Sequence, residues 1–160
     1  IEQNKINLKN KKINIIGHGG ASKAVIYALN EIGSLNITIH SRTQSNNMIK
    51  KFTDIHNLIK DMEVNGAVII NASPYNFIEN ESNIIDKIIS RDIVWIDLLY
   101  TKLSTKYFQR FLSNEGLYFN GIDMLLYQAL ESINIWLRND ISNSVDFSKL
   151  KQHINEVKIA

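Results

Sequence analysis

Short runs of β-branched residues alternate with segments of helical periodicity along this chain. The run at 13–16 (INII) precedes a segment at 22–32 with apolar residues at helical spacing, and Gly33 is placed to end that helix. Further strands are predicted at 36–40, 67–71, 93–97 and 117–119, and further helices at 84–89, 106–113, 122–137 and 147–157. The polar segment 44–61 is predicted to be helical or irregular.

Strands separated by helical segments are typical of parallel β-α units. The sequence therefore predicts an α/β fold, a three-layer doubly wound sheet that is mostly parallel and has helices on both faces. Residues 12–138 are assigned to this domain, 1–11 to an N-terminal lead-in and 139–160 to a C-terminal helical extension. Ligands of such sheets bind outside the carboxyl ends of the strands, where the strand order reverses.

Composition narrows the function classes. The 160 residues contain no cysteine, which excludes disulfides and thiolate metal sites, and a net charge of +2 gives no reason to expect nucleic acid or an anionic membrane as partner. His40, His56 and His153 show no metal-ligand spacing, and no apolar stretch is long enough to span a bilayer. We expect a cytoplasmic protein without a metal, and the sequence leaves a homodimer open.

A glycine-rich loop follows the first predicted strand, in the stretch KINIIGHGGASK at 12–23. Gly17 allows a tight turn, Gly19 lets the backbone approach a pyrophosphate closely, and the helix that follows offers free N–H groups to the anion. Ser22 stands where the usual pattern has its third glycine. The loop therefore favours a Rossmann-like, dinucleotide-binding version of the fold.

The end of the second strand indicates which dinucleotide is bound. An NAD-binding domain usually has a carboxylate there for the ribose 2′-hydroxyl, but this chain has His40-Ser41-Arg42-Thr43. Arg42 can pair with a 2′-phosphate through its fork of donors, and the two hydroxyls can add hydrogen bonds. The alternative is an ordinary solvated arginine at the start of a loop. At this distance from the glycine loop, the pattern favours NADP over NAD.

Five ordered motifs resemble the cofactor-binding, C-terminal domain of the shikimate dehydrogenases, including the quinate/shikimate enzymes. They are GHGGASK at 17–23, SRT at 41–43, NASP at 71–74, DLLY at 97–100 and NGIDMLLYQA at 120–129. The resemblance covers nearly the whole chain. The chain departs from the family pattern at four places. They are the serine at 41 where asparagine is usual, the sequence QSN at 44–46 without the second basic residue that some members have, the sequence YNF after Pro74, and a loop after Tyr100 that lacks prolines.

The resemblance implies NADP as cofactor and a role for each matching residue. Gly17, Gly19, Gly20 and Ala21 would hold the pyrophosphate, and Ser41, Arg42 and Thr43 the 2′-phosphate. Ala72 and Ser73 would line the cofactor groove, and Leu98, Gly121 and Met124 would flank the nicotinamide. Tyr100 and Gln128 would reach the hydroxyls of shikimate. Gln128 suits that role because an amide both donates and accepts, and it lies one helical turn beyond Met124.

The implied reaction is reversible hydride transfer between NADPH and 3-dehydroshikimate, giving shikimate. In that family a lysine–aspartate pair on an N-terminal substrate domain handles the proton, and no part of this chain corresponds to that domain. We therefore assign no catalytic residue here and expect the missing domain in cis or in trans. The alternative is a non-catalytic module that binds NADP or a metabolite, although such a module has no need of both Tyr100 and Gln128.

Several of these residues also have purely structural interpretations. Tyr100 can cap the sheet edge, and Gln128 can be a satisfied buried amide. Leu125 is expected in the core, and Trp95 and Trp136 are expected in the core or between packed helices.

Overall fold

The computed structural model describes residues 6, 8, 11–34, 36–41, 49–51, 67–76, 80, 93–100, 109, 113 and 116–156. The predicted helices at 84–89 and 106–113 lie almost entirely outside these residues, as do Arg42 and Thr43. No helix within the described part of the chain has the length and apolar character needed to cross a membrane.

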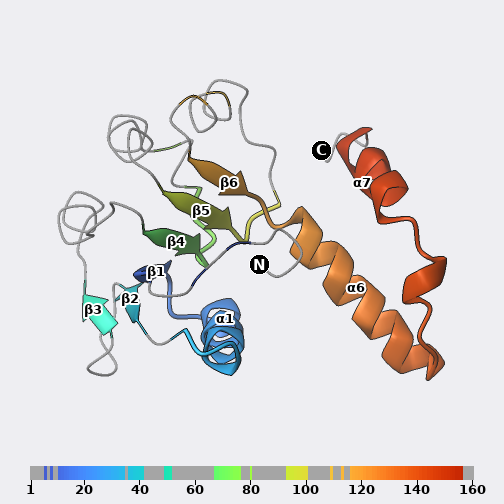
Figure 1. The fold of residues 1–160 in the computed structure, drawn as a ribbon, viewed down its shortest axis with the longest axis horizontal. Coiled ribbons are helices and arrows are strands. Elements are labelled where there is room, and N and C mark those ends of the chain that lie inside the picture. The colour runs from blue at the N-terminus through green and yellow to red at the C-terminus, as the bar shows by residue number, and fades with distance from the viewer. Residues whose placement is uncertain are drawn as a thin grey trace.

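Six strands form one sheet in which every neighbouring pair is parallel (Figure 1). They are β1 (Ile13–Ile16), β2 (Ile37–Ser41), β3 (Ile49–Lys51), β4 (Val68–Asn71), β5 (Val94–Asp97) and β6 (Leu117–Phe119), in the order β3-β2-β1-β4-β5-β6. The order reverses between β1 and β4, where doubly wound sheets bind their ligands. This arrangement confirms the predicted fold class.

Strand β3 corrects the prediction that residues 44–61 are helical or irregular. It pairs in parallel with β2 at the edge of the sheet, where Ile39 lies opposite Ile49 and Ser41 opposite Lys51. Its sequence, IKK, has one β-branched residue followed by two lysines, so it lacks the β-branched or aromatic run that indicated the other strands. Pairing with a neighbouring strand, rather than local pattern, determines its conformation.

Two of the described helices, α1 (Gly20–Glu31) and α6 (Ile122–Leu137), contribute residues to the site, and α7 (Phe147–Glu156) packs on α6. Helix α1 begins two residues earlier than predicted and ends in a Schellman motif, in which Gly33 has φ 74° and Ser34 donates to the Leu29 carbonyl. Helix α6 has the predicted bounds, and α7 follows the short η1 (Ser142–Ser144). Tyr127 of α6 stacks on Phe147 at 4.6 Å between ring centroids.

The core lies between the sheet and α1. Alternate residues of the central strands, Ile13 and Ile15 of β1 among them, pack with Leu29 of α1 in one buried cluster. Leu8 from the predicted lead-in is buried in the same cluster. Trp95 points to the opposite face of the sheet and is buried as predicted.

Two expectations about α6 are wrong. Trp136 is 79% exposed and Leu125 is 40% exposed, so neither belongs to the core. Figure 1 shows α6 extending away from the sheet with α7 beside it, and Ile135 and Leu137 near the end of α6 are exposed as well. Apolar residues on a helix predict burial only where another element packs on that face.

Candidate functional site

The glycine loop packs tightly against the turn that follows β4. Gly17 has φ 109°, and a Cβ added there would lie 2.9 Å from the Ala72 carbonyl oxygen. Two hydrogen bonds of 2.9 Å hold the loop on either side: Gly17 N–H donates to the His40 carbonyl of β2, and Ala72 N–H after β4 donates to the Ile16 carbonyl of β1. Only glycine combines this φ with this close approach. The loop is therefore held between the ends of β2 and β4, as the sequence predicts for a phosphate-binding turn.

Helix α1 presents its N-terminus at the carboxyl end of β1. The first intrahelical bond runs from Lys23 N–H to the Gly19 carbonyl, so the N–H groups of Gly20, Ala21 and Ser22 precede the helical ladder. The first turn has no acidic residue, and a Cβ at Gly19 or Gly20 would meet no atom within 4 Å. This open, electropositive helix end suits an anion such as a pyrophosphate.

Ser22 ties the loop to the helix in place of the third glycine. Its side chain is fully buried, and its hydroxyl donates to the Gly17 carbonyl at 2.7 Å. Ser22 is thus small enough to keep strand and helix in contact, and its side chain makes a hydrogen bond that glycine could not make.

The end of β2 carries a buried serine where NAD-binding domains have a carboxylate. Ser41 is buried, and His40 before it is also buried, with Nε2 2.9 Å from Asn14 Oδ1. Arg42 and Thr43, predicted to contact a 2′-phosphate, lie outside the described residues. The described part of this strand end therefore has no acid to repel a phosphate.

Asn71 at the end of β4 organises the turn that contacts Gly17. Its Oδ1 accepts from the Ser73 backbone N–H at 3.1 Å and from the Ser73 hydroxyl at 2.7 Å. Its Nδ2 donates to the Tyr75 carbonyl at 2.9 Å. These bonds fix the conformation of Ala72 and Ser73, the two residues predicted to line the cofactor groove.

Asp97 at the end of β5 fixes the turn that follows that strand by accepting hydrogen bonds. Its Oδ1 accepts from the Leu99 backbone N–H at 3.0 Å and from Asn71 Nδ2 at 3.2 Å, and the side chain is only 2% exposed. Burial raises the pKa of the Asp97 carboxyl above its ordinary value of 3.8, and the bonds from Leu99 and Asn71 partly offset this rise.

The raised pKa of Asp97 predicts how Asp97→Asn changes stability with pH. The native state keeps a proton on this carboxyl at pH values where the unfolded chain has lost it, so the free energy of unfolding falls as pH rises above 3.8. Asp97→Asn does not ionise, and its amide oxygen can accept the same bonds. We expect the stability of the variant relative to wild type to increase as pH rises above 3.8, measured by urea denaturation at each pH.

Asp140→Asn is the matched control with the opposite sign. Hydrogen bonds from Ser142 lower the pKa of the exposed Asp140 carboxyl. Its ionised form therefore stabilises the fold at neutral pH, and that contribution disappears as pH falls. A stability difference between Asp97→Asn and wild type that stays constant with pH would contradict a raised pKa for Asp97.

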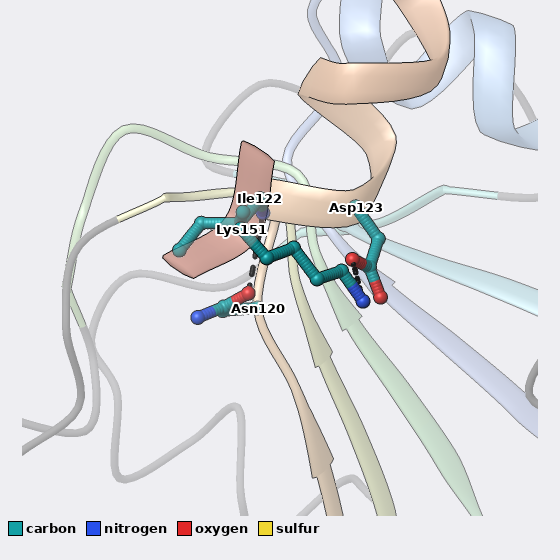
Figure 2. Close-up of polar contacts among 4 residues, drawn as sticks. All are labelled: Asn120, Ile122, Asp123 and Lys151. Carbon is teal, nitrogen blue, oxygen red and sulfur yellow. Dashed lines mark hydrogen bonds and ion pairs between the residues drawn. The ribbon is translucent and has the colours of Figure 1, made fainter. Parts of the chain in front are cut away.

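Gly121 brings the start of α6 against the turn after β5. A Cβ added to Gly121 would fall on the Leu98 carbonyl, with the carbonyl carbon at 2.7 Å, and Gly121 N–H donates to the Leu99 carbonyl at 2.8 Å. Two side-chain interactions hold the start of α6 in place (Figure 2). Asn120 Oδ1 accepts a hydrogen bond from Ile122 N–H at 3.2 Å, and Lys151 of α7 forms a salt bridge with Asp123.

The remaining predicted residues lie on the turn after β5 and on α6. Leu98 and Met124 are half-buried, Tyr100 is 50% exposed, and Gln128 is exposed on α6. The interpretation of Gln128 as a satisfied buried amide is therefore wrong. Exposure leaves the side chains of both Tyr100 and Gln128 accessible to a ligand.

Sequence reasoning missed the side-chain bond between Asn71 and Asp97. Both residues appear in the quoted motifs, but neither was assigned a role. The available signal was a single polar residue closing a buried run, VIIN in β4 and VWID in β5, at equivalent positions of neighbouring strands.

Comparison with known proteins gives relatives along nearly the whole chain, although no family model matches it. A shikimate dehydrogenase (NADP(+)) of Staphylococcus aureus is 30% identical over 155 residues, covering 91% of this chain and 56% of that protein. One from Clostridium botulinum is 34% identical over 142 residues, with 85% and 55% covered. The crystal structure of shikimate dehydrogenase 1 from Peptoclostridium difficile matches with a TM-score of 0.68 at 25% identity, covering 99% of this chain and 57% of that one. The chain thus spans about half the length of the relatives it matches.

Proposed function

We propose that this chain, which belongs to the shikimate dehydrogenase family, is the NADP-binding half of such an enzyme. In this role it holds the cofactor for reversible hydride transfer between NADPH and 3-dehydroshikimate, giving shikimate. The observation that carries the proposal is the glycine loop, packed on the β4 turn where the strand order reverses, with the open end of α1 beside it. The names of the relatives support NADP as the cofactor.

The residues around the loop fit a dinucleotide. The space above Gly19 and Gly20 accommodates a pyrophosphate against the first N–H groups of α1. The absence of an acid among the described residues at the end of β2, followed in sequence by Arg42, favours a 2′-phosphate on the adenosine ribose. Leu98, Gly121 and Met124 are then the residues proposed to flank the nicotinamide, which supplies the hydride chemistry when the cofactor is bound.

Shikimate is proposed to meet this half of the enzyme at Tyr100 and Gln128, whose exposed side chains offer a hydroxyl and an amide. We assign no proton donor to the chain and propose that a substrate domain, in cis or in trans, supplies it. The relatives have enough additional length for such a domain. The exposed apolar residues of α6, Leu125, Ile133 and Trp136, recur at helical spacing and offer a surface for it.

Arg42→Ala tests the choice of cofactor. Removal of the guanidinium takes away a bidentate partner of the 2′-phosphate, which NADH lacks. We expect NADPH affinity to fall about tenfold or more and NADH affinity to change less than about twofold, in fluorescence titrations of the purified chain. Equal losses for the two cofactors would show that Arg42 does not contact the 2′-phosphate. Lys23→Ala is the matched control, since it removes an exposed cation from α1 and should affect both cofactors alike.

A further inference from the structure

We infer that Asn71 and Asp97 form a bridge that couples the turn after β4 to the turn after β5. Through it, a cofactor held by the first turn fixes the position of the second turn, which carries Leu98 and Tyr100. The two bridge residues are positioning residues, since neither is proposed to contact cofactor or substrate. The coupling to NADPH rests on the proposed function, whereas the bridge itself does not.

The register of the sheet brings the two side chains together. Asn71 and Asp97 are the last residues of neighbouring parallel strands and lie directly opposite each other. Side chains at paired positions of parallel strands point to the same face of the sheet. Their 3.2 Å hydrogen bond is therefore built into the pairing of β4 with β5, next to the point where the strand order reverses.

The amide of Asn71 is fully used. Its two donors go to Asp97 and to the Tyr75 carbonyl, and its oxygen accepts twice from Ser73. An amide has two donors and two acceptor positions, so any rotation of this side chain breaks a bond. Asn71 cannot shift towards one turn without releasing the other.

The carboxylate of Asp97 gives the bridge its second end. One oxygen, Oδ1, accepts both the Asn71 amide and the Leu99 backbone N–H, in a site closed to water. These two bonds need only an accepting oxygen at this position, which a carboxyl group and an amide both supply. The backbone adds a parallel link, from Leu98 N–H to the Asn71 carbonyl at 3.0 Å.

Each bridged turn also touches one of the two tightly packed glycines. The β4 turn meets Gly17 at Ala72, and the β5 turn meets Gly121 at Leu98. A continuous set of contacts therefore runs from the proposed pyrophosphate loop, through Asn71 and Asp97, to the start of α6. A shift of the first turn on cofactor binding would therefore be passed to the second turn, because the Asn71 amide is bonded to both turns.

The test follows exchange of the Leu99 amide hydrogen by NMR in the 160-residue chain without ligand. We expect Asn71→Ala to speed this exchange about tenfold, although residue 71 lies on another strand, because Asp97 loses its second bond. Asp97→Ala should do the same, and Asp97→Asn should restore near wild-type exchange because its oxygen still accepts. Asn134→Ala, which removes a loop-holding asparagine on α6, should leave Leu99 exchange unchanged.

If Asn71→Ala does not fold, Asn71→Ser retains a hydroxyl beside the β4 turn but is too short for Asp97, and it is expected to speed Leu99 exchange likewise. Unchanged Leu99 exchange in a folded Asn71 variant would overturn the bridge.

With NADPH added, exchange at Leu99 should slow about tenfold or more in wild type and in Asp97→Asn, but not in Asp97→Ala. Binding of NADPH by wild type without this slowing would overturn the coupling. A wild-type chain that binds no NADPH would instead refute the proposed function, and the ligand-free comparison would still decide the bridge.

Discussion

Gly121→Ala is expected to lower the free energy of unfolding by about 3 kcal/mol or more, the upper range for an overpacked site. The added methyl group would fall on the Leu98 carbonyl, which is backbone and cannot rotate away. The φ of Gly121 is −75°, so the loss comes from the clash alone and not from backbone strain. Urea denaturation of wild type and variant measures this loss in the free energy of unfolding directly.

Gly33→Ala separates clash from strain. Gly33 has φ 74° and an added Cβ meets nothing within 4 Å, so only the left-handed conformation is penalised, by about 1 kcal/mol. If Gly121→Ala lowers the free energy of unfolding no more than Gly33→Ala does, then α6 and the β5 turn are not in tight contact at Gly121.

Gly17→Ala combines both penalties and adds a loss of function. The residue would have to adopt φ 109° with its methyl group 2.9 Å from the Ala72 carbonyl oxygen. We expect a loss of about 3 kcal/mol in stability and at least about a tenfold loss of NADPH affinity, because the loop must move away from the β4 turn. Denaturation and fluorescence titration of the same preparation measure the two effects.

Gly19→Ala is the matched control for Gly17→Ala. An added Cβ there meets no protein atom within 4 Å, and the backbone has an ordinary extended conformation. Stability should therefore change by less than about 1 kcal/mol, while the methyl group intrudes on the space proposed for the pyrophosphate and weakens NADPH binding. If Gly19→Ala leaves NADPH affinity intact, the cofactor does not lie over this loop.

Local pattern sufficed for the fold where an element is long or its ends are marked. Helix α6 has its predicted bounds at 122–137, and Gly33 ends α1 because only its φ allows the Schellman turn. Strand β3 escaped prediction because its pairing with β2 is a long-range interaction. Trp136 was misassigned because burial depends on which elements pack on a helix, and the sequence of the helix does not carry that information.

The candidate site also has a part that the local sequence predicts and a part that depends on long-range packing. The glycine loop was predictable because the turn, the close approach and the helix end each demand particular residues at fixed spacing. The role of Gly121 beside the nicotinamide stays a prediction, and the sequence did not reveal its close packing against Leu98 of the neighbouring turn. The bond between Asn71 and Asp97 depends on strand order and register, which are known only once β4 is placed beside β5.

We propose that this chain holds NADP and that the catalytic acid–base pair is supplied by another domain. The most direct measurement mixes the purified 160-residue chain with NADP⁺ and shikimate, and follows bound NADP⁺ and formation of NADPH in the same sample. We predict saturable binding of NADP⁺ with no formation of NADPH. Failure to bind NADP⁺, or sustained formation of NADPH by the chain alone, would contradict the account.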